Sequence, residues 1–258
     1  MTKSENPFDV HLSSWKAEQD QPWMNLRYRL EYRNIRRYVG EHELSALDAG
    51  GGNAASAIQF AREGHLVTVV DSSEAMLTDG REAAQKAGLD ERMKFHQAEL
   101  VDLPTLFPEP SFDLVLCHNV IQYVEEVDRN LRALVQSLHS NGILSLMTIN
   151  GYYEVYKVAF RELDLEKAIF QLDTDKTRAT LFDVSMRSFS ETELIEMLER
   201  AGCITLGLYG VRCLCDWLPN EPKYNPEFLR KLEELEYRLA DRYPYYLLAR
   251  FYQVIGRK

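Results

Sequence analysis

A glycine-rich segment between two short apolar runs constrains the fold more than any other feature of this chain. Residues 44–47 are typical of a short buried strand and residues 54–62 of the helix that follows it. Three consecutive glycines lie between them, Gly50, Gly51 and Gly52. Glycine allows a sharp turn and lets a ligand lie against bare backbone, where a Cβ atom would block it. The segment therefore predicts a strand, a turn and a helix, with a ligand bound at the turn.

Two acids follow the apolar runs and indicate what the ligand is. Asp48 ends the first run, and Asp71 ends a second, β-branched run over residues 66–70. The interval between the two acids is close to the roughly 20 residues at which an acid binds a ribose in nucleotide-binding βαβ units. The pattern predicts an adenosine-containing cofactor. A glycine turn that only packs a helix on a sheet would leave both acids unexplained.

The loop can be aligned with two cofactor patterns. Gly50, Gly52 and Ala55 fit the G-x-G-x-x-G/A pattern of dinucleotide binding, which keeps an NAD-dependent oxidoreductase as an alternative. Asp48, Gly50 and Gly52 also fit acid-x-G-x-G-x-G, with Ala54 in the last glycine position. An acid at this point would repel a pyrophosphate and attract a cationic aminoacyl group. The second pattern, and hence S-adenosyl-L-methionine, is favoured.

Composition limits the other classes of function. The chain has 258 residues, 45% of them hydrophobic, which suffices for one large domain or one domain with a lid. A net charge of −10 gives no general attraction to nucleic acid or to an anionic membrane. The four cysteines form no C-x-x-C motif, so neither a metal site nor a disulfide framework is expected. With no apolar run of membrane-spanning length, we expect a cytoplasmic protein.

Strand and helix patterns alternate along the chain, which predicts an α/β fold: a Rossmann-like, doubly wound, mostly parallel sheet with helical lid insertions. Further strands are expected at residues 93–96, 112–117, 143–149, 203–209 and 247–255. Helices are expected at residues 24–39, 73–87, 128–138 (stopped by Asn141 and Gly142), 152–169, 190–200 (with a capping box) and 228–242. An irregular stretch is expected after residue 169. We expect a helical cap over residues 1–43 and a domain over residues 44–258, with lid insertions at about 151–189 and 211–243.

In such sheets ligands bind at the carboxyl ends of the strands. Glu99 and Leu100 follow the third strand, where an adenine edge would lie. His118 follows the fourth strand and could orient a substrate or act as a base; a capping or packing histidine is the alternative. Cys117 is expected to be a small buried apolar group.

Methyl transfer from a sulfonium requires few catalytic groups from the protein, because the cofactor itself supplies the reactive methyl group. A carboxylate acceptor would need no base and would be bound by arginines. Arg212 and Arg250 suit that role, although a surface ion pair would explain either one. Tyr245, in an aromatic run over residues 243–246, could stack on a planar base or serve in packing.

Several of these motifs together resemble the class I S-adenosylmethionine-dependent methyltransferases. They are the loop at 48–52, Asp71 with Ser72, Met76, the strand at 112–116 and the segment 141–144. Shorter matches over almost the whole chain resemble the bacterial tRNA 5-carboxymethoxyuridine methyltransferase family: Leu26 with Arg27, 144–147 with Asn150, 210–212 with Asp216, 234–236 with Arg238, Pro244 with Tyr245, and Arg250 with Phe251.

The resemblance implies methyl-esterification of a carboxymethoxy group on the wobble uridine of tRNA, with tRNA as the partner. It places the cofactor contacts on Arg27, Gly50, Gly51, Asp71, Leu100, Val101 and His118, with His118 organising the reaction centre. Two alternatives remain: a methyltransferase acting on a small-molecule acid or hydroxyl, and a non-catalytic adenosine-binding protein. An acceptor site would require His118, Arg212 and Arg250 to lie in one cavity.

Overall fold

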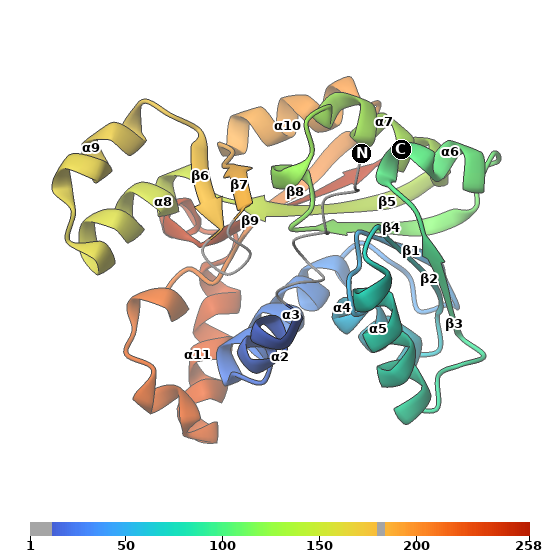
Figure 1. Ribbon diagram of the computed structural model, residues 1–258, viewed down its shortest axis with the longest axis horizontal. Helices are drawn as coiled ribbons and strands as arrows, with labels where there is room; N and C mark the ends of the chain where they lie inside the picture. Colours follow the sequence, from blue (N-terminus) through green and yellow to red (C-terminus); the bar gives the residue numbers. More distant parts are fainter. Residues whose placement is uncertain (1–11, 180–183) are drawn as a thin grey trace, which may run out of the picture.

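The computed structural model describes residues 12–179 and 184–258, and its centre is a seven-stranded sheet with the order β3-β2-β1-β4-β5-β9-β8 (Figure 1). The strands are β1 (Ser45–Ala49), β2 (Leu66–Asp71), β3 (Met93–Gln97), β4 (Phe112–His118), β5 (Leu138–Ile149), β8 (Ile204–Val211) and β9 (Phe251–Arg257). Strands β1 to β5 pair in parallel, whereas β9 runs antiparallel between β5 and β8. The predicted Rossmann-like, mostly parallel sheet is confirmed.

Helices cover both faces of the sheet, because successive strand residues point to opposite sides and both sides are apolar. In β1, Leu47 belongs to one buried cluster and Ala46 to the other. Figure 1 shows α6 (Leu103–Leu106), α7 (Val127–Ser137) and α10 (Glu191–Arg200) on one face, and α3 (Pro22–Ile35), α4 (Ala55–Arg62) and α5 (Glu74–Lys86) on the other.

The predicted stop of the helix before β5 is wrong. Helix α7 ends at Ser137, and the chain becomes extended at once, with φ −78° and ψ 140° at Leu138. Asn141, whose φ is 65°, lies inside β5 and donates its N–H to the Lys258 carbonyl. The turn-forming pair Asn141-Gly142 therefore marks an irregularity in the strand, at the level where the β4–β5 register shifts.

Two insertions follow the parallel strands. The first contains α8 (Gly151–Lys157), the π-helical η3 (Val158–Glu162), α9 (Leu165–Leu172), β6 (Lys176–Ala179) and β7 (Val184–Arg187). Here the expected irregular stretch is corrected, because β6 and β7 pair antiparallel in a sheet of their own. The second contains η4 (Cys215–Trp217), η5 (Glu221–Tyr224) and α11 (Pro226–Leu239). The predicted boundaries of the cap and lids stay a prediction.

Helix ends near the site follow local capping chemistry. Ser73 accepts the N–H of Met76 at the start of α5, and Ser190 accepts that of Glu193 at the start of α10.

The last predicted strand begins later than expected, because residues 245–248 form the 3-10 turn η6 (Tyr245–Leu248).

The arginine-rich helix α3 packs against α11. Arg29 pairs with Glu233 at 2.7 Å, Arg37 with Asp241 at 2.7 Å, and Arg33 with Glu234 at 3.6 Å. The first and third pairs join the two helices, whereas Arg37 and Asp241 lie just after α3 and α11; the paired residues are about 200 positions apart in the sequence. Helix α2 (Leu12–Gln19) lies beside α3.

Within the described ranges, no helix is long and apolar enough to cross a membrane.

Candidate active site

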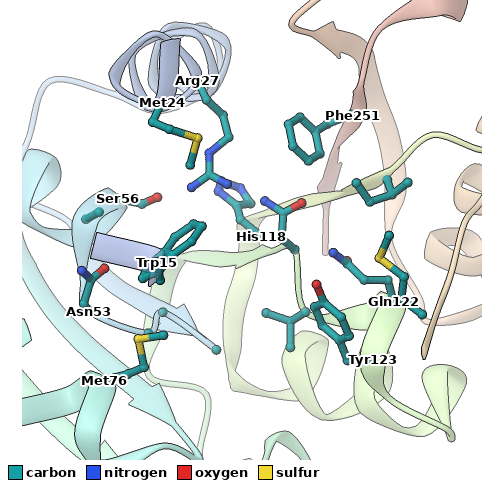
Figure 2. Close-up of a pocket in the computed structure, with 18 of the residues that line it drawn as sticks. Trp15, Met24, Arg27, Asn53, Ser56, Met76, His118, Gln122, Tyr123 and Phe251 are labelled. Atoms are coloured by element: carbon teal, nitrogen blue, oxygen red, sulfur yellow. The ribbon is translucent and has the colours of Figure 1, made fainter. Parts of the chain in front are cut away.

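A cavity of about 940 Å³ lies at the carboxyl ends of β1 and β4, where the strand order reverses. This is the point at which open α/β sheets bind their ligands. Figure 2 shows Arg27 extending from α3 into the cavity, with Trp15 and Met24 also on its wall. The lid insertion contributes Tyr153, Glu154, Lys157 and Arg161, so one cavity spans the loop after β1 and the inner side of the lid.

The loop after β1 needs its glycines. Gly50 has a φ of 72° and donates its N–H to the Val70 carbonyl at 2.7 Å. A Cβ atom on Gly50 would lie 2.3 Å from Val120 Cγ2, and one on Gly51 would lie 2.7 Å from Asp48 Cγ. Gly52 has room for a side chain, but its φ of 55° favours glycine. Packing and backbone conformation thus require glycine here, and all three glycines line the cavity.

Asp71 holds this loop from the tip of β2. Its Oδ2 accepts the Gly52 N–H at 2.8 Å, and its Oδ1 accepts the Ser73 N–H at 2.9 Å. The carboxylate lines the cavity in an orientation that these two hydrogen bonds fix.

The segment after β3 reaches the cavity in part. Glu99 and Leu100 line it, and Glu99 also forms a capping box with Asp102 around η1 (Leu100–Asp102). Val101, the third residue expected here, is not on the cavity wall.

Buried charged groups meet beneath the loop. The side chains of His118 and Glu31 are 5% and 2% exposed, with 3.5 Å between Nδ1 and Oε2. The other Glu31 oxygen accepts the Ser56 hydroxyl at 2.5 Å. Burial opposes ionisation of Glu31, but His118, Arg27 and Ser56 together hold its pKa below the usual range. Glu31 is therefore a carboxylate at neutral pH.

Asp48 behaves differently from Glu31. Burial raises the pKa of Asp48 to about 7; His118 opposes the shift, while the carboxylates of Glu31 and Asp71 add to it. Its Oδ2 atom is buried and has no hydrogen-bond partner. An acid in this state gains most from a cation placed beside it.

A chain of polar groups orients His118. Gln253 donates from Nε2 to the Ser145 hydroxyl oxygen at 2.9 Å, and Ser145 lies 2.8 Å from His118 Nε2. The Ser145 hydroxyl therefore links Gln253 to His118 Nε2, while Nδ1 of the ring faces the Glu31 carboxylate at 3.5 Å. Both ring nitrogens thus face protein groups.

Other buried polar atoms on the cavity wall have no hydrogen-bond partner. Asn119, held in the left-handed region with φ 59°, has two such atoms; the others are Nε of Arg27, Arg212 and Arg250, Nδ1 of His118 and the Tyr153 hydroxyl. Buried polar atoms in folded proteins are nearly always paired. A ligand with both donors and acceptors would satisfy them.

Two arginines share one acid on the far side of the cavity. Arg212 and Arg250 both bind Oδ1 of the buried Asp216, Arg250 at 3.0 Å. Burial opposes ionisation of Asp216, but Arg212 and then Arg250 hold its pKa below the usual range. One negative and two positive charges leave a net positive charge of one. The side chain of Arg250 is 36% exposed and that of Arg212 only 3%, so Arg250 is the more accessible guanidinium.

Glu236 of α11 fixes the loop that carries this pair. Its carboxylate accepts three successive backbone N–H groups, those of Cys213 at 2.5 Å, Leu214 at 2.9 Å and Cys215 at 2.6 Å. Such a row of N–H groups is an anion-binding concavity. Arg212 precedes it with a φ of 64°, a conformation that few non-glycine residues adopt.

The structure thus brings His118, Arg212 and Arg250 to one cavity, together with all the predicted residues of the β1 and β2 tips. Tyr245 is not on its wall; it lies in η6 and is 52% exposed. The sequence motifs assigned no site role to the acids Glu31 and Asp216, although Asp216 belongs to the family resemblance. Each follows an arginine by four residues, Arg27 and Arg212 respectively, and this spacing is the signal that could have indicated them.

The cysteines have structural roles. All four are free and buried, and burial raises the pKa of the Cys117 thiol, as expected for a small apolar group. In the part of the chain that the structure describes, no three His, Cys, Asp or Glu side chains are grouped to hold a metal ion.

Comparison with known proteins decides the family. Residues 47–146 match the family model described as a methyltransferase domain. Over 237 residues the chain is 30% identical to the tRNA 5-carboxymethoxyuridine methyltransferase of Escherichia coli K12, covering 90% of this chain and 88% of that protein. The chain belongs to the S-adenosylmethionine-dependent methyltransferases. This methyltransferase is therefore an enzyme that uses S-adenosyl-L-methionine, and the dinucleotide and non-catalytic alternatives are set aside.

Solved structures share the fold of this methyltransferase. An S-adenosylmethionine-dependent methyltransferase from Mesorhizobium loti aligns with a TM-score of 0.59 at 22% identity, over 89% of this chain and 98% of that one. The 1,6-didemethyltoxoflavin-N1-methyltransferase of Burkholderia thailandensis, with bound S-adenosylhomocysteine, aligns with a TM-score of 0.58 at 16% identity, over 100% and 92%.

Proposed function

We propose that S-adenosyl-L-methionine binds along the loop after β1. The cavity there offers bare glycine backbone, an unpartnered oxygen on Asp48 and an unpartnered nitrogen on Arg27. An amino acid group carries one cation and one carboxylate, which suit these two side chains. The residues that would hold the cofactor are Arg27, Asp48, Gly50, Gly51, Gly52, Asp71, Glu99, Leu100 and His118; Val101 would act only through its neighbours.

The methyl acceptor, in this proposal, is a carboxylate held by Arg250 and Arg212. The observation that carries it is the net positive charge of the Arg212–Asp216–Arg250 group, inside the cavity that the cofactor loop also lines. A guanidinium binds a carboxylate with two parallel hydrogen bonds. The resulting ester is neutral and loses this attraction, which favours product release.

His118 would organise the site. The bound cofactor supplies an electrophilic methyl group, and a carboxylate acceptor is already an effective nucleophile without a base. Both nitrogens of His118 face protein groups, Ser145 and Glu31, so the ring is suited to shape the wall of the cavity. The chain's task is to position the carboxylate and exclude water.

The specific acceptor proposed is 5-carboxymethoxyuridine in tRNA. Its support is the name of the Escherichia coli relative together with identity over 90% of this chain. A tRNA acceptor would place the reaction in the cytoplasm, as the sequence predicts.

A small-molecule acid is the second candidate. The net charge of −10 and the pairing of Arg29, Arg33 and Arg37 with acids in or next to α11 leave little general attraction for RNA.

The deciding experiment incubates the purified enzyme with methyl-labelled S-adenosylmethionine and bulk tRNA from cells that lack its gene. We expect label in the tRNA that mild base removes, because esters are base-labile. Bulk tRNA from cells that keep the gene is the matched control and should take up much less label. If the enzyme binds the cofactor but labels neither sample, the tRNA proposal fails and small acids become the candidates.

A further inference from the structure

Four aromatic side chains form a continuous cluster between the two lid insertions. Trp217 lies 5.2 Å from Tyr153, 6.5 Å from Tyr156 and 6.0 Å from Phe160, measured between ring centroids. The rings of Tyr156 and Phe160 are 5.8 Å apart and nearly parallel, with 11° between their planes. We call these four residues the lid aromatic cluster.

The outer part of the cluster is open to solvent. Phe160 is 66% exposed and Tyr156 is 41% exposed. Exposed apolar groups that gather in one place mark interaction sites more often than isolated ones do. A stacked pair with an exposed ring is a surface on which another flat ring can lie.

The inner part of the cluster reaches the acceptor side of the cavity. Tyr153 is 1% exposed and lines the cavity, and the Arg250 guanidinium carbon lies 5.9 Å from its ring centroid. Arg161, on the same segment as Phe160, lines the cavity as well, and so does Lys157, whose ammonium group is paired with the Glu154 carboxylate. An unbroken path of rings and cations therefore leads from the arginine pair to the surface.

We propose that the lid aromatic cluster binds the bases next to the acceptor nucleotide in a single-stranded RNA loop, by stacking on Phe160 and Tyr156. This rests on the proposed function, in which the acceptor belongs to tRNA. Bases of unpaired RNA loops are recognised by stacking on aromatic side chains, and nearby cations bind the phosphates. A protein partner on the same surface would cover the lid side of the cavity and hinder the acceptor, which favours RNA as the occupant.

The test compares Phe160→Ala and Tyr156→Ala with the wild type in steady-state methylation of tRNA that carries 5-carboxymethoxyuridine. We expect KM for the tRNA to rise about tenfold for Phe160→Ala, the loss typical of one stacked base. The affinity for S-adenosylmethionine, kcat at saturating tRNA and turnover of the free 5-carboxymethoxyuridine nucleoside should stay unchanged. Phe160→Trp should keep the low KM.

Phe170→Ala is the matched control, because Phe170 is 70% exposed on α9 of the same lid. Its KM for tRNA should equal that of the wild type. An unchanged KM for Phe160→Ala, or an equal rise for both variants, overturns the stacking surface while leaving the tRNA proposal intact. A wild-type enzyme that methylates only small acids overturns both. Dissociation of an oligomer by Phe160→Ala, in analytical ultracentrifugation, would assign the surface to a second copy of the chain and also overturn the inference.

Discussion

Asp48 combines two costs that a folded protein usually avoids. It is buried beside the carboxylates of Glu31 and Asp71, and one of its oxygens has no hydrogen-bond partner. A buried charge without a partner is destabilising, so the group is partly protonated near neutral pH. A cation beside it would favour the ionised form. Cofactor binding would then release a proton.

The first prediction follows from this linkage. With a pKa of about 7, the ionised fraction of Asp48 increases by roughly a factor of eight between about pH 6 and pH 7.5. The Kd of S-adenosylmethionine should fall by a similar factor over that range. The range lies below the usual α-amino pKa of about 8, so the cofactor's own amino group stays mostly protonated. Isothermal titration calorimetry at several pH values measures it. Asp48→Asn should bind more weakly and with a flat profile; a flat profile in the wild type would contradict the linkage.

The second prediction separates the two arginines. Arg250→Ala removes the accessible guanidinium and leaves Asp216 paired with Arg212, so the chain should fold. Charge-assisted hydrogen bonds contribute about 1.5–3 kcal/mol, so KM for the acceptor should rise on the order of 10- to 100-fold. The affinity for the cofactor, measured in parallel, should not change. If both affinities fall equally, Arg250 is structural. Arg212→Ala removes a buried charge partner and should lower the free energy of unfolding as well.

At the scale of elements, α11 acts as a support for the acceptor side of the cavity. Its Glu236 holds the loop of Cys213 to Cys215 through three backbone N–H groups, and that loop positions Arg212 and Asp216. The same helix pairs with α3, which carries Arg27 into the cavity and places Glu31 beside His118. The two sides of the site are thus braced by one helix.

The third prediction concerns Glu236→Gln. The amide keeps one acceptor oxygen but turns its NH₂ group toward backbone donors, which should lower the free energy of unfolding by about 1–3 kcal/mol in urea titrations. KM for the acceptor should rise while the Kd of the cofactor stays the same. Glu233→Gln on the same helix loses only an ion pair near the surface and should cost less than about 1 kcal/mol. Equal effects of the two variants on KM would show that Glu236 does not position the arginines.

Elements whose signals are local could be predicted from the sequence. The glycines and the strand-end acids predict the unit of β1, its loop and α4. The hydroxyl of Ser73 likewise predicts the N-terminal cap of α5. The pair Asn141-Gly142 misled the prediction because a turn signal is the same in a helix stop and in an irregular strand. The contact of Gln253 with Ser145 joins positions 108 residues apart, and no local pattern encodes it.

The fourth prediction belongs to the whole molecule. A ligand that binds only the folded state at about 100 times its Kd adds about 2.7 kcal/mol of stability, which for a chain of this size raises Tm by about 5–10 °C. S-adenosylmethionine should produce this shift in differential scanning fluorimetry, and NAD should not. Asp71→Asn keeps an acceptor for one of the two loop N–H groups and turns its NH₂ group toward the other, so its Tm without ligand should be somewhat lower and most of the ligand-induced shift should be lost. A full shift in Asp71→Asn would show that Asp71 does not bind the ribose.

The position of β9 has a consequence for the order in which the site appears during protein synthesis. The strand lies between β5 and β8, both of which the ribosome makes earlier. Until β9 emerges, both neighbours present unpaired edges that can join other nascent chains. Ser145 also lacks the Gln253 amide that donates to its hydroxyl oxygen, the atom that lies 2.8 Å from His118 Nε2. The pocket therefore matures only once β9 has been made, and a chain released before Gln253 lacks the contact that completes the polar chain to His118.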